Sequence, residues 1–231
     1  MTQPLHIGIV GCSAEGAALC YRTICAEGAL RLGAHRHPPV SMHTPSLHDY
    51  VACLERGDMD GVAALMLDSA RRLRAAGADF LICPDNTIHQ AFDRVERASP
   101  LPWLHIARVV AQNAAARGFR KLGLTGTAWL VASDVYPVAL ASEGLACVRP
   151  TDAEREVMGR IIMDELVAGQ VLPQSLSTFQ SVVAGFRAQG CDAVILGCTE
   201  IPLILNDGNA GLPTLDSTRL LALAALDRAL G

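Results

Sequence analysis

Two similar stretches of sequence decide the fold: AAGADFLICPDNT at residues 75–87 and AQGCDAVILGCTE at residues 188–200. They align without a gap, and the alignment pairs Gly77 with Gly190 and Asp85 with Cys198. In each stretch a helix-like segment closes at a glycine, a short apolar run follows, and polar residues come next. This order is typical of a helix C-cap, a buried strand and a loop at the carboxyl end of that strand.

A second repeat lies upstream of the first. HIGIVGCS at residues 6–13 aligns with KLGLTGTA at residues 121–128, so that Gly8 pairs with Gly123 and Gly11 with Gly126. Each copy is an apolar run that ends in a glycine turn. The two repeats together predict two related lobes, each with a first strand and a later strand that both end in polar loops.

The rest of the chain alternates short apolar runs with longer amphipathic stretches, which predicts parallel strands joined by crossover helices. The fold class is therefore α/β, with two pseudo-symmetric lobes that each contain a mostly parallel sheet flanked by helices. We expect residues 1–98 and 208–231 to form lobe 1 and residues 99–207 to form lobe 2. The expected strands are Leu5–Val10, Phe80–Cys83, Lys121–Leu124 and Ala193–Leu196, and the expected helices are Ala14–Ala26, Val51–Gly57, Asp60–Ala76, Leu104–Arg117, Ala153–Val167, Leu176–Gln189 and Ser217–Ala229.

Composition excludes several classes of protein. The chain has 231 residues, of which 51% are hydrophobic and 18% charged, so a large core can form. Its net charge of −4, without a basic stripe, argues against nucleic-acid binding. No apolar run is long enough to span a membrane, and the amino terminus reads as a first strand rather than a signal peptide. The eight cysteines form no C-x-x-C pair, so we expect no metal site and a reducing, cytoplasmic location.

The polar loops are the expected functional site, because open α/β sheets bind ligands at the carboxyl ends of their strands. If the two lobes face each other, four such loops line one cleft, and Asp85 and Cys198 stand on opposite sides of it. This arrangement suits a reaction in which a proton leaves one face of a carbon and arrives at the other. The alternative is that the duplication reflects ancestry only and that the cleft binds without chemistry.

The sequence resembles the aspartate/glutamate racemase family, whose members racemise amino acids without pyridoxal phosphate. The resemblance covers nearly the whole chain and implies a two-lobed α/β fold, cofactor-free chemistry at the α-carbon of a small carboxylate-bearing substrate, and a homodimer. In this family two cysteines commonly flank the α-carbon, one before Asn-Thr and one in Gly-Cys-Thr. The segments that carry the resemblance are GIVGCS at 8–13, RGDMDGVAALMLDSARRLRAAGAD at 56–79, DNTIH at 85–89, KLGLTGT at 121–127, EREVMGRIIMDELVAG at 154–169, GCTEIPLIL at 197–205 and LDSTRLLALAAL at 215–226.

This chain keeps the family's second cysteine, Cys198, and departs at the first. Asp85 stands before Asn86-Thr87, and the internal repeat also makes Asp85 the partner of Cys198. We therefore expect Asp85 to be the opposing acid/base. Cys83 is the alternative, because a residue two positions away on an extended chain returns to the same face.

The remaining candidates would bind the substrate. Without an electron sink, the site must stabilise an enediolate-like carboxylate, for which hydroxyl, amide and backbone N–H donors at loop ends are suitable. The alternative for these residues is ordinary turn chemistry and helix capping. Glu200 could receive the substrate ammonium, and His89 could orient Asp85 or pair with a distal carboxylate. The donor candidates are Ser13, Asn86, Thr87, Thr125, Thr127 and Thr199.

We thus predict a cofactor-independent amino-acid racemase or epimerase, an isomerase with no metal, that acts on a small amino acid or dicarboxylate. A resting Asp85 carboxylate can remove a proton and a resting Cys198 thiol can deliver one. The reverse direction needs the opposite protonation states, so the two directions should have unequal rates. Two alternatives remain open: a related single-cysteine decarboxylase or cis–trans isomerase of small dicarboxylic acids, and a non-catalytic amino-acid-binding protein.

Overall fold

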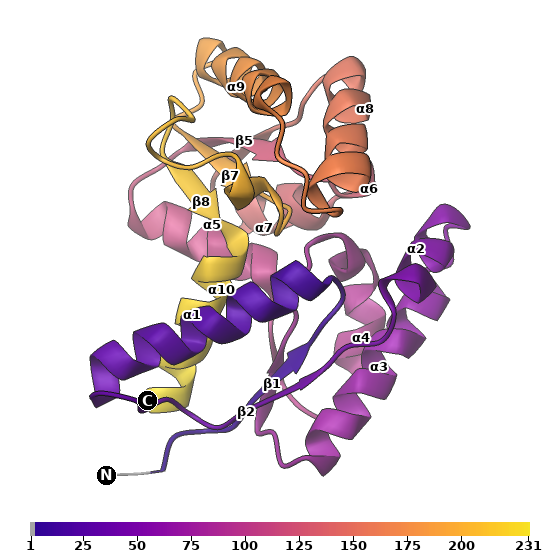
Figure 1. The fold of residues 1–231 in the computed structure, drawn as a ribbon, viewed down its shortest axis with the longest axis vertical. Helices are drawn as coiled ribbons and strands as arrows, with labels where there is room; N and C mark the ends of the chain where they lie inside the picture. The colour runs from indigo at the N-terminus through magenta and orange to yellow at the C-terminus, as the bar shows by residue number, and fades with distance from the viewer. Residues whose placement is uncertain (1–2) are drawn as a thin grey trace. The chain divides into compact units, whose positions relative to one another are not determined.

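The computed structural model describes residues 3–231 and contains two sheets of four parallel strands (Figure 1). The first sheet has the strand order β2-β1-β3-β4, and the second has the order β6-β5-β7-β8. All of the strand pairs are parallel, which confirms the predicted α/β class. The strands are β1 (Ile7–Val10), β2 (Val40–His43), β3 (Phe80–Ile82), β4 (Trp103–Leu104), β5 (Lys121–Thr125), β6 (Ala146–Val148), β7 (Ala193–Leu196) and β8 (Thr214–Asp216).

The internal repeat of the sequence is also a repeat of topology. When β5 to β8 are counted as a second set of four, both sheets have the same strand order. Ile7 lies opposite Phe80 in the first sheet, and Leu122 lies opposite Ala193 in the second. The two sequence alignments match these same residues, so the two repeats share one strand register.

Two equivalent glycines leave room for a neighbouring core side chain. A Cβ atom on Gly8 would lie 2.6 Å from Leu81 Cδ2, and one on Gly123 would lie 2.3 Å from Phe186 Cδ2. Both distances are far shorter than a carbon–carbon contact. A side chain at Gly8 would therefore displace Leu81 of the neighbouring strand β3, and one at Gly123 would displace Phe186 of α9.

The first sheet is covered by helices on both faces. Helix α1 (Ala14–Leu32) is joined to α10 (Ser217–Leu230) by an ion pair between Arg31 and Asp227, and these two helices lie together in Figure 1. Helix α3 (Met59–Ala75) contacts α2 (Leu47–Glu55), β1 and α4 (Phe92–Ala98). A short 3-10 helix, η1 (Thr87–Ala91), leads from the end of β3 into α4.

The second sheet has its own helices. They are α5 (Ile106–Ala116), α6 (Ala128–Ala132), α7 (Val135–Ser142), α8 (Asp152–Arg160), the π-helix η2 (Ile161–Leu166), α9 (Pro173–Ala188) and the 3-10 helix η3 (Ile201–Leu203). The helix predicted at 153–167 is thus α8 continued by a π-helix. Its wider turns are seen in the bond from Val167 N–H to the Ile162 carbonyl at 2.9 Å, five residues apart.

The chain divides into two compact units. The first runs to Ile106 and includes Thr218–Gly231, and the second is Ala107–Ser217. The boundaries expected from sequence, after residues 98 and 207, fall earlier than these. The difference arises because β4 pairs with β3 and β8 pairs with β7, and such two- and three-residue edge strands leave no apolar run in the sequence.

Candidate active site

The strand order places a topological switch point in each sheet. In the first unit the chain leaves β1 toward β2 but leaves β3 toward β4, so the connections diverge between β1 and β3. The same divergence lies between β5 and β7 in the second unit. Ligands of open α/β sheets bind at the carboxyl ends of such strands. The segments at these ends are 11–13 and 83–89 in the first unit, and 125–127 and 197–200 in the second.

Asp85 is fixed through its main chain and its side chain. Its carboxylate oxygen Oδ1 accepts the Ile88 N–H at 3.1 Å, at the start of η1. Its carbonyl oxygen lies 2.6 Å from His89 Nδ1. The Asp85 side chain is half-buried, so its carboxylate is partly accessible although these hydrogen bonds hold the loop in place.

His89 is buried and contacts the main chain through both ring nitrogens. Nδ1 donates to the Asp85 carbonyl, and Nε2 lies 3.5 Å from the Ile106 N–H. The ring stacks on Phe92 at a centroid distance of 5.4 Å and meets the edge of His105 at 4.6 Å. Of the two roles expected for His89, these contacts support orientation of the Asp85 loop.

Cys83 is fully buried, and its sulfur lies 4.0 Å from the Asp85 carbonyl oxygen. Burial, followed by the nearby Asp85 charge, raises the pKa of the Cys83 thiol well above its usual value. The group is therefore a protonated thiol at neutral pH and a poor proton acceptor. This environment favours Asp85 over Cys83 as the acid/base of the first unit.

The other first-unit candidates are buried at helix starts. Ser13 caps α1 by accepting the Gly16 N–H at 3.1 Å, which is the capping alternative weighed for it. Asn86 precedes η1, and its carbonyl accepts the His89 N–H at 3.3 Å. Thr87 is the first residue of η1 and is 6% exposed.

In the second unit, Cys198 belongs to a buried hydrogen-bonded cluster. The Cys198 thiol donates to Glu200 Oε2 at 2.9 Å, and the Thr199 hydroxyl donates to the same oxygen at 2.7 Å. Cys198, Thr199 and Glu200 are 9%, 5% and 3% exposed. This hydrogen bond favours the protonated thiol of Cys198, because a thiolate beside the Glu200 carboxylate would place two negative charges together.

The Cys198 loop is held against the end of β5. The Thr125 hydroxyl donates to the Ile195 carbonyl at 2.6 Å, and the Gly197 N–H donates to the Thr125 carbonyl at 3.0 Å. Thr127 caps α6 by accepting the Leu130 N–H at 3.2 Å. Thr125 and Thr127 thus have structural partners, and their expected substrate contacts stay predictions.

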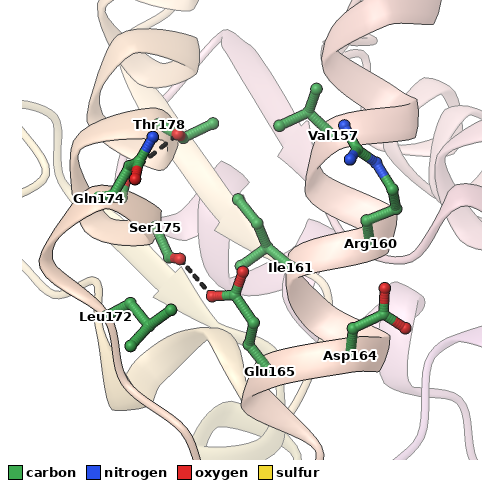
Figure 2. Close-up of a pocket in the computed structure, with 9 residues that line it drawn as sticks. All are labelled: Val157, Arg160, Ile161, Asp164, Glu165, Leu172, Gln174, Ser175 and Thr178. Atoms are coloured by element: carbon green, nitrogen blue, oxygen red, sulfur yellow. Dashed lines mark hydrogen bonds between the residues drawn. The ribbon is translucent and has the colours of Figure 1, made fainter.

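A separate cavity of about 270 Å³ lies between α8, η2 and α9 (Figure 2). Figure 2 shows Glu165 pointing toward Ser175, whose hydroxyl donates to the carboxylate. None of the lining residues is one of the predicted site residues. They are Val157, Arg160, Ile161, Asp164, Glu165, Leu172, Gln174, Ser175 and Thr178.

Two buried polar residues of the first unit were not predicted from the sequence. Ser69 on α3 is fully buried, and its hydroxyl lies 2.9 Å from His43 Nδ1 at the end of β2. Tyr50 on α2 is also fully buried. The position of Ser69 on the apolar face of the helix predicted at residues 60–76 could have indicated a buried polar contact.

Residues 3–231 contain no group of three or more His, Cys, Asp or Glu side chains that could hold a metal ion. Over the same residues, no helix combines the length and the apolar character needed to cross a membrane.

The chain thus has two parallel α/β units, and each unit has polar residues at its switch point. This arrangement is that of a two-lobed α/β enzyme, and comparison with known proteins leads to the same class. The family model described as Asp/Glu/Hydantoin racemase matches residues 9–225, so the chain belongs to this family. It is an amino-acid racemase, which is an isomerase.

Three relatives are particularly similar. A candidate Asp/Glu racemase of known structure from Yersinia pestis is 32% identical, with a TM-score of 0.90 over 98% of this chain and 100% of that one. PH1733, an aspartate racemase homologue from Pyrococcus horikoshii, is 28% identical, with a TM-score of 0.84 over 100% of both chains. The broad specificity amino-acid racemase RacX of Bacillus subtilis is 24% identical over 168 residues, 71% of each chain.

Proposed function

We propose that the protein racemises or epimerises a small amino acid without a cofactor, with Asp85 and Cys198 acting on opposite faces of the α-carbon. One observation carries this proposal. Asp85 and Cys198 follow the strands at the two switch points, and they occupy equivalent positions of the internal repeat. A single proton acceptor cannot both remove and deliver a proton on opposite faces, so the reaction needs such a pair.

The intermediate of this reaction is an enediolate-like carboxylate. Donors already fixed before the substrate arrives stabilise it best, since they need not reorganise during the reaction. The buried hydroxyl group of Thr87 lies two residues from Asp85 and suits this role, whereas the Thr199 hydroxyl donates to Glu200 and would have to turn toward the substrate. The backbone N–H groups of the same loops would add to it.

The resting protonation states favour one direction. Asp85 rests as a carboxylate and Cys198 as a thiol that donates to Glu200, so Asp85 removes the α-proton and Cys198 returns one. The reverse direction needs a protonated Asp85 and a Cys198 thiolate. Because two enantiomers are equally stable, kcat/KM must be equal in the two directions. The asymmetry must therefore be seen in kcat and in KM separately.

Proton exchange in deuterated water tests the proposal. We expect the wild-type protein to exchange the α-proton of at least one amino acid in a panel of both enantiomers, as followed by NMR. Asp85→Asn removes the carboxylate base and Cys198→Ala removes the thiol, so each variant should lose racemisation at least a thousandfold.

Cys147→Ala is the matched control for the cysteine variant. Cys147 lies on the edge strand β6, and burial raises the pKa of its thiol to about 11, so it stays protonated. Its replacement should leave exchange unchanged. Full activity in both Asp85→Asn and Cys198→Ala would contradict the assignment.

The same preparations separate the alternative functions. Carbon dioxide release or cis–trans conversion with small diacids would indicate a related single-cysteine enzyme. Saturable binding with thermal stabilisation, but no exchange, would indicate an amino-acid-binding protein. A homodimer and a cytoplasmic location stay predictions from the sequence, which sedimentation and cell fractionation would test.

A further inference from the structure

The cavity between α8, η2 and α9 contains neither of the proposed acid/bases, and the proposed reaction does not use it (Figure 2). Its volume of about 270 Å³ is close to the lower end of the range for small-molecule sites. Apolar side chains and a few polar groups line it together, as they do in such sites. One of its walls is the π-helix η2, and π-helical turns are frequent at functional positions. The cavity therefore has the size and composition of a site for a small metabolite.

Glu165 offers a carboxylate oxygen to this cavity. The side chain is half-buried, and its Oε2 accepts a hydrogen bond from the Ser175 hydroxyl. Within residues 3–231, the other oxygen, Oε1, has no hydrogen-bond partner, and Figure 2 shows it directed away from Ser175. A half-buried negative charge is best stabilised by a charged donor, because such a donor also neutralises it. An ammonium group of a ligand fits this requirement.

Arg160 supplies the opposite charge to the same cavity. Its side chain is exposed, and its guanidinium forms no ion pair with any of residues 3–231. Asp164 lies four residues further on, at the usual spacing of a helical ion pair, yet the two do not pair. Arg155 on the same helix does pair with Asp152, at 3.1 Å. The Arg160 guanidinium is thus available to a ligand carboxylate, which it can bind through two parallel hydrogen bonds.

Apolar side chains complete the lining. Val157, Ile161 and Leu172 all line the cavity, and Figure 2 shows Ile161 in the middle of the residues drawn. These side chains suit an aliphatic group. A free aliphatic amino acid has a carboxylate for Arg160, an ammonium group for Glu165 and an apolar side chain for this surface.

The cavity also shares a core with the Cys198 loop. Ile161 lines the cavity, and it belongs with Cys198 and Ile201 to one cluster of buried residues. Helix η2 contacts η3, and η3 begins directly after Glu200. Because close-packed interiors transmit small displacements, a ligand that moves Ile161 also changes the packing around Cys198.

We propose that this cavity is a second binding site, for a free aliphatic amino acid, and that its occupancy changes the rate of racemisation through the Cys198 loop. The binding half is independent of the proposed function. The regulatory half rests on the proposed role of Cys198.

Methyl NMR of the whole protein, titrated with L-leucine and D-leucine, tests the binding half. We expect saturable shifts of the Ile161 methyl signals with at least one enantiomer. Isocaproate is leucine without the ammonium group, and isoamylamine is leucine without the carboxylate. Each should bind at least about tenfold more weakly, because each loses one charge-assisted contact.

Two variants assign the contacts. Arg160→Gln and Glu165→Gln each remove one charge and should weaken leucine binding at least about tenfold. The amide oxygen introduced by Glu165→Gln can still accept from Ser175, and isocaproate, which has no ammonium group, should bind this variant no more weakly. Arg155→Gln is the matched control, since Arg155 lies on the same helix and already pairs with Asp152. It should leave leucine binding unchanged.

Steady-state kinetics test the regulatory half. At a saturating concentration of a substrate other than leucine, added leucine should change kcat of the wild type and of Arg155→Gln at least about twofold. In Arg160→Gln the basal kcat should equal that of the wild type, and leucine should not change it. Competition at the active site would raise KM and leave kcat unchanged, so it is distinguished from regulation.

Several results would overturn the inference. The binding half is wrong if Ile161 does not shift, or if shifts are confined to Ile88 in the Asp85 loop, which would place leucine only at the proposed active site. Unchanged affinity in both Arg160→Gln and Glu165→Gln would also contradict it. Binding at Ile161 with an unchanged kcat would refute the regulatory half. Failure of the proposed function is separate, because it is seen as full activity in Asp85→Asn and Cys198→Ala, whereas the titration needs no activity.

Discussion

Asp85 and Cys198 occupy equivalent positions of the internal repeat, but different partners hold them. A backbone N–H binds the Asp85 carboxylate, while the Cys198 thiol contacts the carboxylate of Glu200. In the proposed reaction, these contacts suit the first residue to accept a proton and the second to donate one. This difference at the residue scale is the source of the asymmetry proposed for the two directions.

Gly197, next to Cys198, is a residue whose lack of a side chain matters. A Cβ atom there would lie 2.5 Å from the Thr125 carbonyl oxygen, and this oxygen belongs to the backbone and cannot move aside easily. We expect Gly197→Ala to lower the free energy of unfolding by about 1–3 kcal/mol and to displace the Cys198 loop, which lowers kcat. Urea unfolding and racemisation assays measure the two effects.

Gly185→Ala is the control for this prediction. Gly185 lies inside α9, where a Cβ atom would lie 3.7 Å from its nearest neighbour, Glu154 Oε1. Alanine should stabilise the helix by about 0.5–1 kcal/mol and leave activity unchanged. Equal stability of the two variants would show that the loop tolerates a side chain at Gly197.

At the element scale, the π-helix η2 determines which side chains face α9. Its hydrogen-bonded residues are five positions apart, and Glu165 of this turn points toward Ser175, as Figure 2 shows. Ser175 is 3% exposed, so its hydroxyl gives the half-buried carboxylate a partner that water would otherwise supply. This contact joins two elements of the second unit across the cavity.

We expect Ser175→Ala to lower the free energy of unfolding by about 1–3 kcal/mol, because Glu165 loses its hydroxyl partner. Ser177→Ala is the control: its exposed hydroxyl donates only to the Pro173 carbonyl of the same helix. That change should stay within about 0.5 kcal/mol. Urea unfolding checks both, and equal midpoints would show that the contact does not stabilise the fold.

At the scale of the whole molecule, the chain returns to the first unit after building the second. Residues 218–231 belong to the first unit, where the Leu5 N–H donates to the Ala229 carbonyl at 2.9 Å. The Arg228 guanidinium lies over the Phe80 ring at 4.8 Å. The carboxyl-terminal helix therefore completes a core that the amino-terminal residues began.

Leu226→Ala tests this connection. Leu226 is fully buried in α10, so its truncation should lower the free energy of unfolding by about 2–5 kcal/mol. Hydrogen exchange should show the loss of protection in β1 and β3, with β5 and β7 less affected. Leu203→Ala, at a site 47% exposed, should change stability by less than about 0.5 kcal/mol. Loss of protection in the second unit alone would contradict the assignment of α10.

The sequence predicted the central strands and most of the longer helices. β7 was predicted at its observed bounds, and β1, β3 and β5 within two residues, because strands buried on both faces are continuous apolar runs. The edge strands were missed: β2 and β6 are partly exposed and contain polar or small residues, as their position requires. Helices α6 and α7 were missed as well, since they are short and carry no clear periodicity.

For the candidate site, spacing and repeat identified the loops that carry Asp85 and Cys198, because local sequence determines where a strand ends. The order of the strands, the burial of Cys83 and the contact between His43 and Ser69 depended on residues far apart in the chain. Only the tertiary structure brings such residues together. Sequence alone thus determined the elements and the chemistry available, and the packing of those elements decided which groups meet, because burial and hydrogen bonding are properties of neighbours in space.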